Sequence, residues 1–147
     1  MKKFELTSET KINIFGKKLF RIKALVSFGV VKTGETGGWV EKEENVNQSG
    51  DAWVFGNAEV FGNARVSGNA EVFGNADYTT IHGFGTQFRT TTFFRCKDKQ
   101  VKVSCGCFYG TIPEFREQVK NTRDGKIAEE YLMIADLMEK HFAEEAK

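Results

Sequence analysis

Between Gly50 and Thr79 the chain alternates small and large apolar positions with a strict period of six residues. Five units follow one another: GDAWVF, GNAEVF, GNARVS, GNAEVF and GNADYT. Each carries Ala at its third position and Val or Tyr at its fifth, and residues two apart in a strand face the same side. Gly and Asn then tolerate the positive φ of a turn. The pattern predicts short strands joined by corners, because an amphipathic helix would need a period of about 3.6 residues.

This motif is similar to the hexapeptide repeat of left-handed parallel β-helices, in which three units close one coil. The resemblance predicts that residues eighteen apart superpose, with Trp53 above Glu71 and Phe55 above Phe73. Because side chains alternate along a strand, the aromatic ring that follows each inward Val is expected to point outward. Outward rings on a thin solenoid form an apolar patch of the kind that is typical of an interface. The predicted interface residues are Trp53, Phe55, Phe61 and Phe73. We expect a homo-oligomer, threefold as in other hexapeptide-repeat proteins; the alternative is that flanking segments of the same chain cover these rings.

The regions around the repeats predict three parts. Residues 1–37 contain short alternating apolar runs and are expected to form an N-terminal β cap. Residues 38–79 form the predicted β-helix, with 38–49 as a degenerate first rung and Gly34–Gly38 as the turn that leads into it. Residues 80–147 predict a C-terminal α+β cap made of a β-hairpin and two helices. The predicted fold is therefore mainly β: a short left-handed parallel β-helix between two caps.

Within the third part, Arg89–Cys96 and Gln100–Cys105 have the composition of paired strands. Thr111 and Glu114 form a capping box that starts a helix running to about Asn121. Residues 126–146 predict a second helix with apolar residues at spacings of three and four. We expect this apolar stripe to pack on the hairpin, and pairing with a partner helix is the alternative.

Composition narrows the possible environments. The net charge is +1, so no general attraction to a nucleic-acid polymer or a membrane surface is expected. No apolar run has transmembrane length and no signal peptide is evident, so a cytoplasmic protein is expected. Three cysteines argue against a disulfide framework.

A Gly- and Thr-rich segment after the repeats is the candidate ligand site. Glycine backbone amides, hydroxyl groups and arginines are groups that hold an anion, and a nearby ring could stack on a base. The spacing matches neither the Walker loop nor the dinucleotide fingerprint, and a Thr-rich strand is the structural alternative. The candidate ligand-binding residues are Gly83, Phe84, Gly85, Thr86, Phe88, Arg89, Thr90, Thr91, Thr92 and Arg95.

Catalytic and metal chemistry have little support in the sequence. Cys105 and Cys107 lie too close together for a typical zinc pair, so no metal site is predicted. His82 invites comparison with hexapeptide acyltransferases, which use a His as general base, but none of the five units contains a His. We therefore predict no catalytic residues and no cofactor, and keep an acyltransferase as an alternative.

Taken whole, the chain resembles small hypothetical proteins carried by bacterial prophages. The resemblance is carried by residues 4–10, 21–25 and 37–45, by the GNAxV repeats, and by residues 91–95 and 101–107. It implies a non-enzymatic phage accessory protein. By analogy such a protein counters host immunity by sequestering an anionic small molecule such as a cyclic nucleotide, or alternatively by inhibiting a bacterial defence protein.

Overall fold

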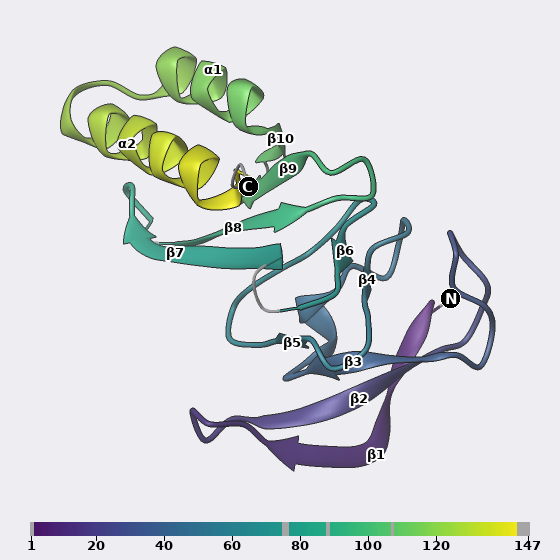
Figure 1. Cartoon of the computed structure of the whole chain (residues 1–147). Coiled ribbons are helices and arrows are strands. Elements are labelled where there is room, and N and C mark those ends of the chain that lie inside the picture. Colours follow the sequence, from purple (N-terminus) through teal and green to yellow (C-terminus); the bar gives the residue numbers. More distant parts are fainter. Residues whose placement is uncertain (1, 75–76, 88, 107, 144–147) are drawn as a thin grey trace.

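The computed structural model describes residues 2–74, 77–87, 89–106 and 108–143. Figure 1 shows an antiparallel sheet in the middle of the molecule, with two helices on one side and the N-terminal strands and repeats on the other. None of the helices in the described ranges is long and apolar enough to cross a membrane.

The N-terminal strands form a mixed four-stranded sheet with one strand of the repeats. Its order is β1 (Phe4–Ile12), β2 (Lys18–Ala24), β3 (Thr36–Val40) and β5 (Glu59–Val60). β1 and β2 pair antiparallel as a hairpin, whereas β3 and β5 run parallel.

The expected turn at Gly34–Gly38 is partly wrong, because β3 begins at Thr36. Gly37 and Gly38 are buried within this strand. An added Cβ at either position would lie 2.6 Å from a backbone oxygen of the repeats, so these glycines permit close packing instead of a turn.

The inward positions of the first four repeats are confirmed, and Ala76 of the fifth lies outside the described residues. Ala and Val alternate as expected, and the following side chains are at most 3% exposed: Ala52, Val54, Ala58, Val60, Ala64, Val66, Ala70 and Val72. The expected eighteen-residue superposition is also present at one place. There β4 (Trp53–Val54) pairs in parallel with β6 (Glu71–Val72), and the rings of Phe55 and Phe73 stack with centroids 4.4 Å apart.

The prediction of a left-handed parallel β-helix is nevertheless wrong. The described strands lie in a mixed sheet, an antiparallel sheet and the two-stranded pair β4–β6. Spacing explains the failure: Val46 pairs with Val66, twenty residues away, whereas Trp53 pairs with Glu71, eighteen away. The Asn47 and Asp51 amides donate to the carbonyls of residues 66 and 68. The donors are four positions apart and the acceptors only two, so the donor segment contains two additional residues at this point. Residues 38–49 are therefore offset from the eighteen-residue register, and β3 pairs antiparallel with β2 of the N-terminal hairpin on one side and parallel with β5 on the other.

The C-terminal part agrees better with the prediction from the sequence. Its antiparallel sheet has the order β10 (Phe108–Thr111), β9 (Val101–Cys105), β8 (Arg89–Arg95) and β7 (Tyr78–Phe84), which confirms the expected hairpin and adds a strand at each edge. The capping box of Thr111 and Glu114 starts α1 (Ile112–Thr122). The second helix, α2, spans Gly125–Phe142; its predicted end at Ala146 lies outside the described residues.

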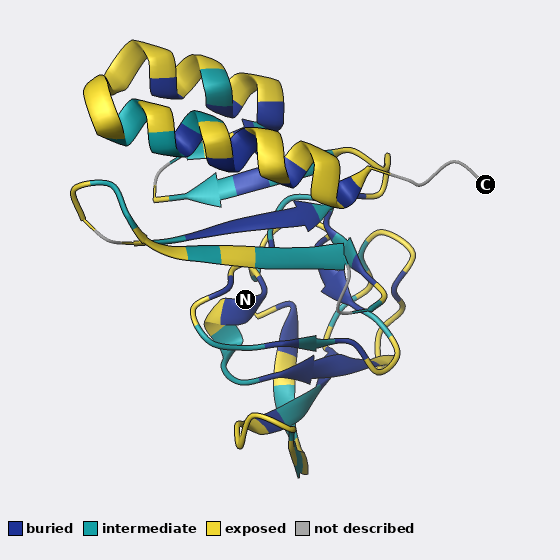
Figure 2. Ribbon diagram, turned by 60° about the vertical axis from the view of Figure 1, so that its left-hand side comes forward, coloured by how far each residue is buried: buried dark blue, intermediate teal, exposed yellow. Residues whose placement is uncertain are grey.

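This antiparallel sheet separates two hydrophobic cores. On β8 the adjacent residues Phe93 and Phe94 are both 0% exposed and belong to different cores. Phe93 packs with the inner faces of the helices, as the apolar stripe predicts, and Phe94 packs with the repeats and the N-terminal sheet. Figure 2 shows the buried residues of both helices on the side toward the sheet. One face of β8 therefore packs against the helices and the other against the repeats and the N-terminal sheet. The predicted ligand residues on β8 are divided between these two faces.

Candidate functional site

The predicted Gly-rich ligand loop is largely the β7–β8 hairpin. Gly83 adopts φ +94° beside the irregularity between His82 and Phe84, so it supports a bulge. Gly85 adopts φ +79°, and a Cβ there would lie 2.5 Å from the Tyr131 hydroxyl oxygen. These glycines therefore have structural reasons to be present that require no ligand.

Strand alternation divides the predicted threonines between two faces. Thr91 points toward the helices and donates a hydrogen bond from Oγ1 to Cys105 Sγ, 3.1 Å away. Thr92 points the other way, and its Oγ1 accepts a hydrogen bond of 3.0 Å from the Arg65 amide. Thr90 shares the face of Thr92. The expectation that one ligand contacts all three hydroxyls is wrong, because successive side chains of a strand face opposite sides.

Arg95 is a structural residue. Its Nε lies 3.2 Å from Asp77 Oδ1, and its Nη1 donates to the Phe142 carbonyl oxygen at 3.2 Å. The guanidinium also lies 5.3 Å from the centre of the Phe142 ring. These contacts hold the end of α2 against the sheet, and Arg95 lines neither of the two cavities described below.

Only one of the two predicted stacking rings lies in the described part of the chain. Phe84 packs against the core beneath the helices. Phe88 lies outside the described residues.

A polar cavity of about 450 Å³ lies on the repeat-facing side of the sheet. Arg65 and Arg89 both line it, and within the described ranges neither has a carboxylate or a side-chain hydrogen-bond partner. The remaining described lining residues are neutral: Asn63, Thr90, Thr92, Ser104 and Gly106. Among the described lining residues there is no acid, so an anion would meet two positive charges and several hydroxyls with no opposing carboxylate.

The position of Arg89 depends on a glycine. Gly106 follows β9 with φ +59°, and any side chain there would collide with the Arg89 guanidinium. Arg89 can therefore lie across the end of the sheet, where it borders both the polar cavity and a second cavity on the opposite face.

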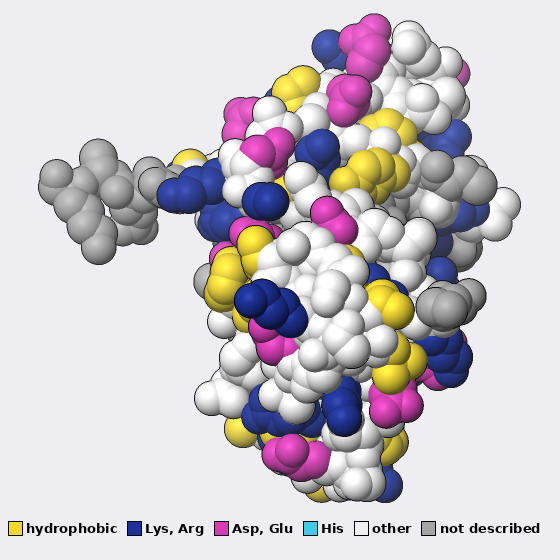
Figure 3. Space-filling model, turned by 90° about the vertical axis from the view of Figure 1, so that its right-hand side faces the viewer, with side chains coloured by type: hydrophobic (Ala, Val, Ile, Leu, Met, Phe, Trp, Pro, Cys, Tyr) yellow, Lys and Arg dark blue, Asp and Glu magenta, His cyan; other side chains and the backbone are white. Residues whose placement is uncertain are grey.

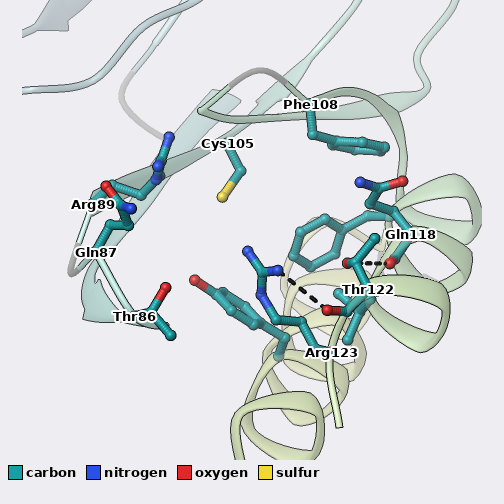
Figure 4. Close-up of a pocket in the computed structure, with 11 residues that line it drawn as sticks. Thr86, Gln87, Arg89, Cys105, Phe108, Gln118, Thr122 and Arg123 are labelled. Carbon is teal, nitrogen blue, oxygen red and sulfur yellow. Dashed lines mark hydrogen bonds between the residues drawn. The ribbon is translucent and has the colours of Figure 1, made fainter.

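This second cavity, of about 230 Å³, lies beneath the helices (Figure 4). Arg89 and Arg123 approach it from opposite sides, and Phe115 and Tyr131 contribute aromatic surface. Burial raises the pKa of Tyr131, the neighbouring Cys105 raises it further, and Arg123 and Arg89 act in the opposite direction. The cavity is smaller than the 300–1,000 Å³ typical of small-molecule sites. We therefore take the polar cavity as the candidate site.

The sequence prediction included Arg89, Thr90 and Thr92 and missed Asn63, Arg65, Ser104 and Gly106. The repeat pattern could have identified Arg65 as a candidate site residue. It stands where neighbouring units have Glu59 and Glu71, and Ser67 stands where they have Phe61 and Phe73.

The predicted interface is reduced by one residue. Trp53 is 1% exposed, with its indole packed edge-on against Phe4 and Phe28, so it cannot contact a partner and the prediction for it is wrong. Flanking strands thus cover part of the expected apolar surface. Phe73 remains 60% exposed on top of the half-buried Phe55.

Phe61 is half-buried and contacts Phe15 of the β1–β2 hairpin, at 5.8 Å between ring centres. Figure 3 shows that, on the face it presents, basic, acidic and hydrophobic side chains alternate over short distances. No single charge dominates that face.

The groups considered for catalysis are dispersed. His82 is exposed on β7, where its Nδ1 lies 3.3 Å from Thr90 Oγ1. The acyltransferase alternative requires neighbouring coils of a parallel β-helix, and the described strands form no such helix. In the described part of the chain no three His, Cys, Asp or Glu side chains gather as metal ligands, and Cys107 lies outside it.

Comparison with known proteins adds no assignment. No protein-family model matches the chain, and no curated protein matches it.

Proposed function

We propose that this chain is a non-enzymatic binding protein that holds a small molecule through an anionic group in the polar cavity. The observation that carries the proposal is that Arg65 and Arg89 line one cavity without an acidic partner among the described residues. Arginines that stabilise a fold usually pair with carboxylates, as Arg116 does with Asp136 at 2.8 Å. Two arginines facing one cavity in this way are better explained by an exogenous anion.

The chemistry of the cavity suits phosphate more than a neutral ligand. Each guanidinium can donate two parallel hydrogen bonds to a phosphate. Three hydroxyls and one amide surround the two arginines, and they can satisfy the remaining anion oxygens. The volume of about 450 Å³ lies within the range of ordinary small-molecule sites.

Phage origin and sequestration of a cyclic nucleotide stay predictions from the resemblance. The phosphate of such a signal would fit the chemistry around the arginines. No aromatic side chain occurs among the described lining residues of the polar cavity, so base stacking has no support there. The proposal therefore concerns the anionic group, and the cyclic nucleotide is one candidate that carries it.

Calorimetric titration of the purified chain with inorganic phosphate and with cyclic AMP tests this proposal. We expect Arg65→Ala and Arg89→Ala each to weaken binding about 10- to 100-fold, since hydrogen bonds to charged groups contribute about 1.5–3 kcal/mol. Arg116→Ala removes an arginine of α1 that pairs with Asp136 of α2 and lines neither cavity, and it serves as the matched control. The proposal is contradicted if neither anion binds, or if both cavity variants bind as tightly as the control.

A second candidate is a protein–protein inhibitor of a bacterial defence protein, favoured by the exposed ring of Phe73. Phe73 is the outer member of a stacked pair of rings, and large exposed apolar side chains often mark binding surfaces. Phe73→Asp should abolish capture of such a target and leave phosphate binding intact. Loss of phosphate binding in this variant would contradict the separation of the two surfaces.

A further inference from the structure

The polar cavity continues into a second polar depression. This neighbouring cavity measures about 630 Å³ and shares Arg65, Ser104 and Gly106 with the first. We call the two together the polar groove. One wall is formed by the repeats and by the segment around Val46, and the other by β8 and the end of β9.

The far end of the polar groove carries the opposite charge. The side chains that line it include Lys2, Glu43 and Glu44. Lys2 pairs with Glu43 at 3.0 Å, and Gln48 also donates to Glu43 at 3.2 Å. Glu44 is exposed and has no ion pair or hydrogen bond with any described residue. One unpaired carboxylate therefore lines the second depression, and two unpaired arginines line the first, with Arg65 shared by both.

The backbone fixes the relation between the two ends. The Val66 amide donates to the Asn45 carbonyl oxygen, and the Asn47 amide donates to the Val66 carbonyl oxygen, both at 3.0 Å. The Asn45 side chain is 0% exposed and donates to the Ala64 carbonyl oxygen at 2.8 Å. Glu44 and Arg65 thus stand next to residues locked in one ladder. A ligand that spans them would pay little to order the protein.

We propose that the polar groove binds a zwitterionic small molecule whose anionic group lies between Arg65 and Arg89 and whose protonated amine lies at Glu44. This inference rests on the proposed function and narrows its ligand to phosphorylated or carboxylated amines. A simple anion would use the arginines alone and leave the carboxylate end unused. The amine supplies the ion pair that Glu44 lacks among the described residues.

Aminoalkyl phosphonates with about two to six carbons test the proposal, each compared with the alkyl phosphonate of equal length. At the length that spans the groove we expect the amine to tighten binding about two- to fivefold, the range of an exposed ion pair. Glu44→Gln should remove this gain and leave the affinity for the plain alkyl phosphonate unchanged. Glu35→Gln, an exposed carboxylate on the turn between β2 and β3, is the matched control and should retain the gain.

The outcomes separate the inference from the proposed function. If alkyl phosphonates bind and the amine gives no gain at any length, or if the gain survives Glu44→Gln, the inference is overturned and the anion site stands. If neither phosphate nor any phosphonate binds, the proposed function fails and the inference fails with it.

Discussion

Gly37 in β3 allows a direct test of how the N-terminal sheet packs on the repeats. A Cβ at this position would lie 2.6 Å from the Val54 carbonyl oxygen and 2.7 Å from the indole of Trp53. Neither neighbour can yield easily, because one is backbone and the other is 1% exposed. The backbone at Gly37 lies outside the left-handed region, so the penalty of Gly37→Ala is steric. Overpacking of this kind costs about 2 kcal/mol of unfolding free energy, which lowers the melting temperature by about 4–8 °C.

Two other glycines provide matched controls for this substitution. Gly74→Ala meets no described atom within 4 Å and needs no left-handed backbone, so we expect it to stabilise the fold by about 0.4–1 kcal/mol. Gly56→Ala also enters open space, but its φ of +57° costs about 1 kcal/mol. Urea and thermal unfolding followed by far-ultraviolet circular dichroism would rank the variants. If Gly37→Ala melts at or above the wild type, β3 does not approach the repeats as described.

Three further substitutions test separate parts of the molecule. Burial lowers the pKa of Lys3 from 10.5 to about 8. Between these pH values the unfolded chain binds more protons than the folded chain, so the free energy of unfolding rises with pH. Urea unfolding of Lys3→Met should lack that rise, and a variant whose stability rises with pH as steeply as that of the wild type would contradict the assignment to Lys3. Thr111→Ala removes the cap of α1, and we expect a loss of about 1 kcal/mol in urea unfolding, with Thr122→Ala at the other end of the helix as a milder control. We expect an oligomer held partly through Phe73, so Phe73→Asp should lower the mass measured by light scattering; a monomeric wild type would refute this.

The elements that depend on neighbouring residues could be predicted from the sequence. The capping box placed the start of α1, and apolar spacing identified the buried face of α2. Alternation identified the buried Ala and Val of the repeats, because each pair is set by a strand of two or three residues. These features require no knowledge of what lies across the core.

The sheet partners could not be predicted in the same way. Pairing of β3 with β5 depends on two additional residues between Asn47 and Asp51, and a regular repeat hides such an offset. Trp53 was expected outside because alternation alone cannot show that Phe4 and Phe28 cover it. Gly37 and Gly38 have turn-like composition, although here glycine permits close approach of two backbones. In each case the missing information was a contact made by residues distant in the chain.

The candidate site coincides with a repeat that differs from both of its neighbours. In the unit GNARVS, Arg65 stands in place of the Glu and Ser67 in place of the Phe of the two flanking GNAEVF units, and both residues line the polar groove. Arg65 and Ser67 do not belong to the buried core, so restoring the common pattern with Arg65→Glu and Ser67→Phe should leave the unfolding free energy within about 0.5 kcal/mol of the wild type.

The same double substitution would place a carboxylate beside Arg89 and a ring in the groove. We therefore expect it to abolish phosphate binding in calorimetry while the circular dichroism spectrum stays unchanged. Retained binding would mean that the departure from the repeat has no part in the site. Combined loss of folding and binding would instead assign Arg65 and Ser67 to the packing of the repeats against β8 and β9.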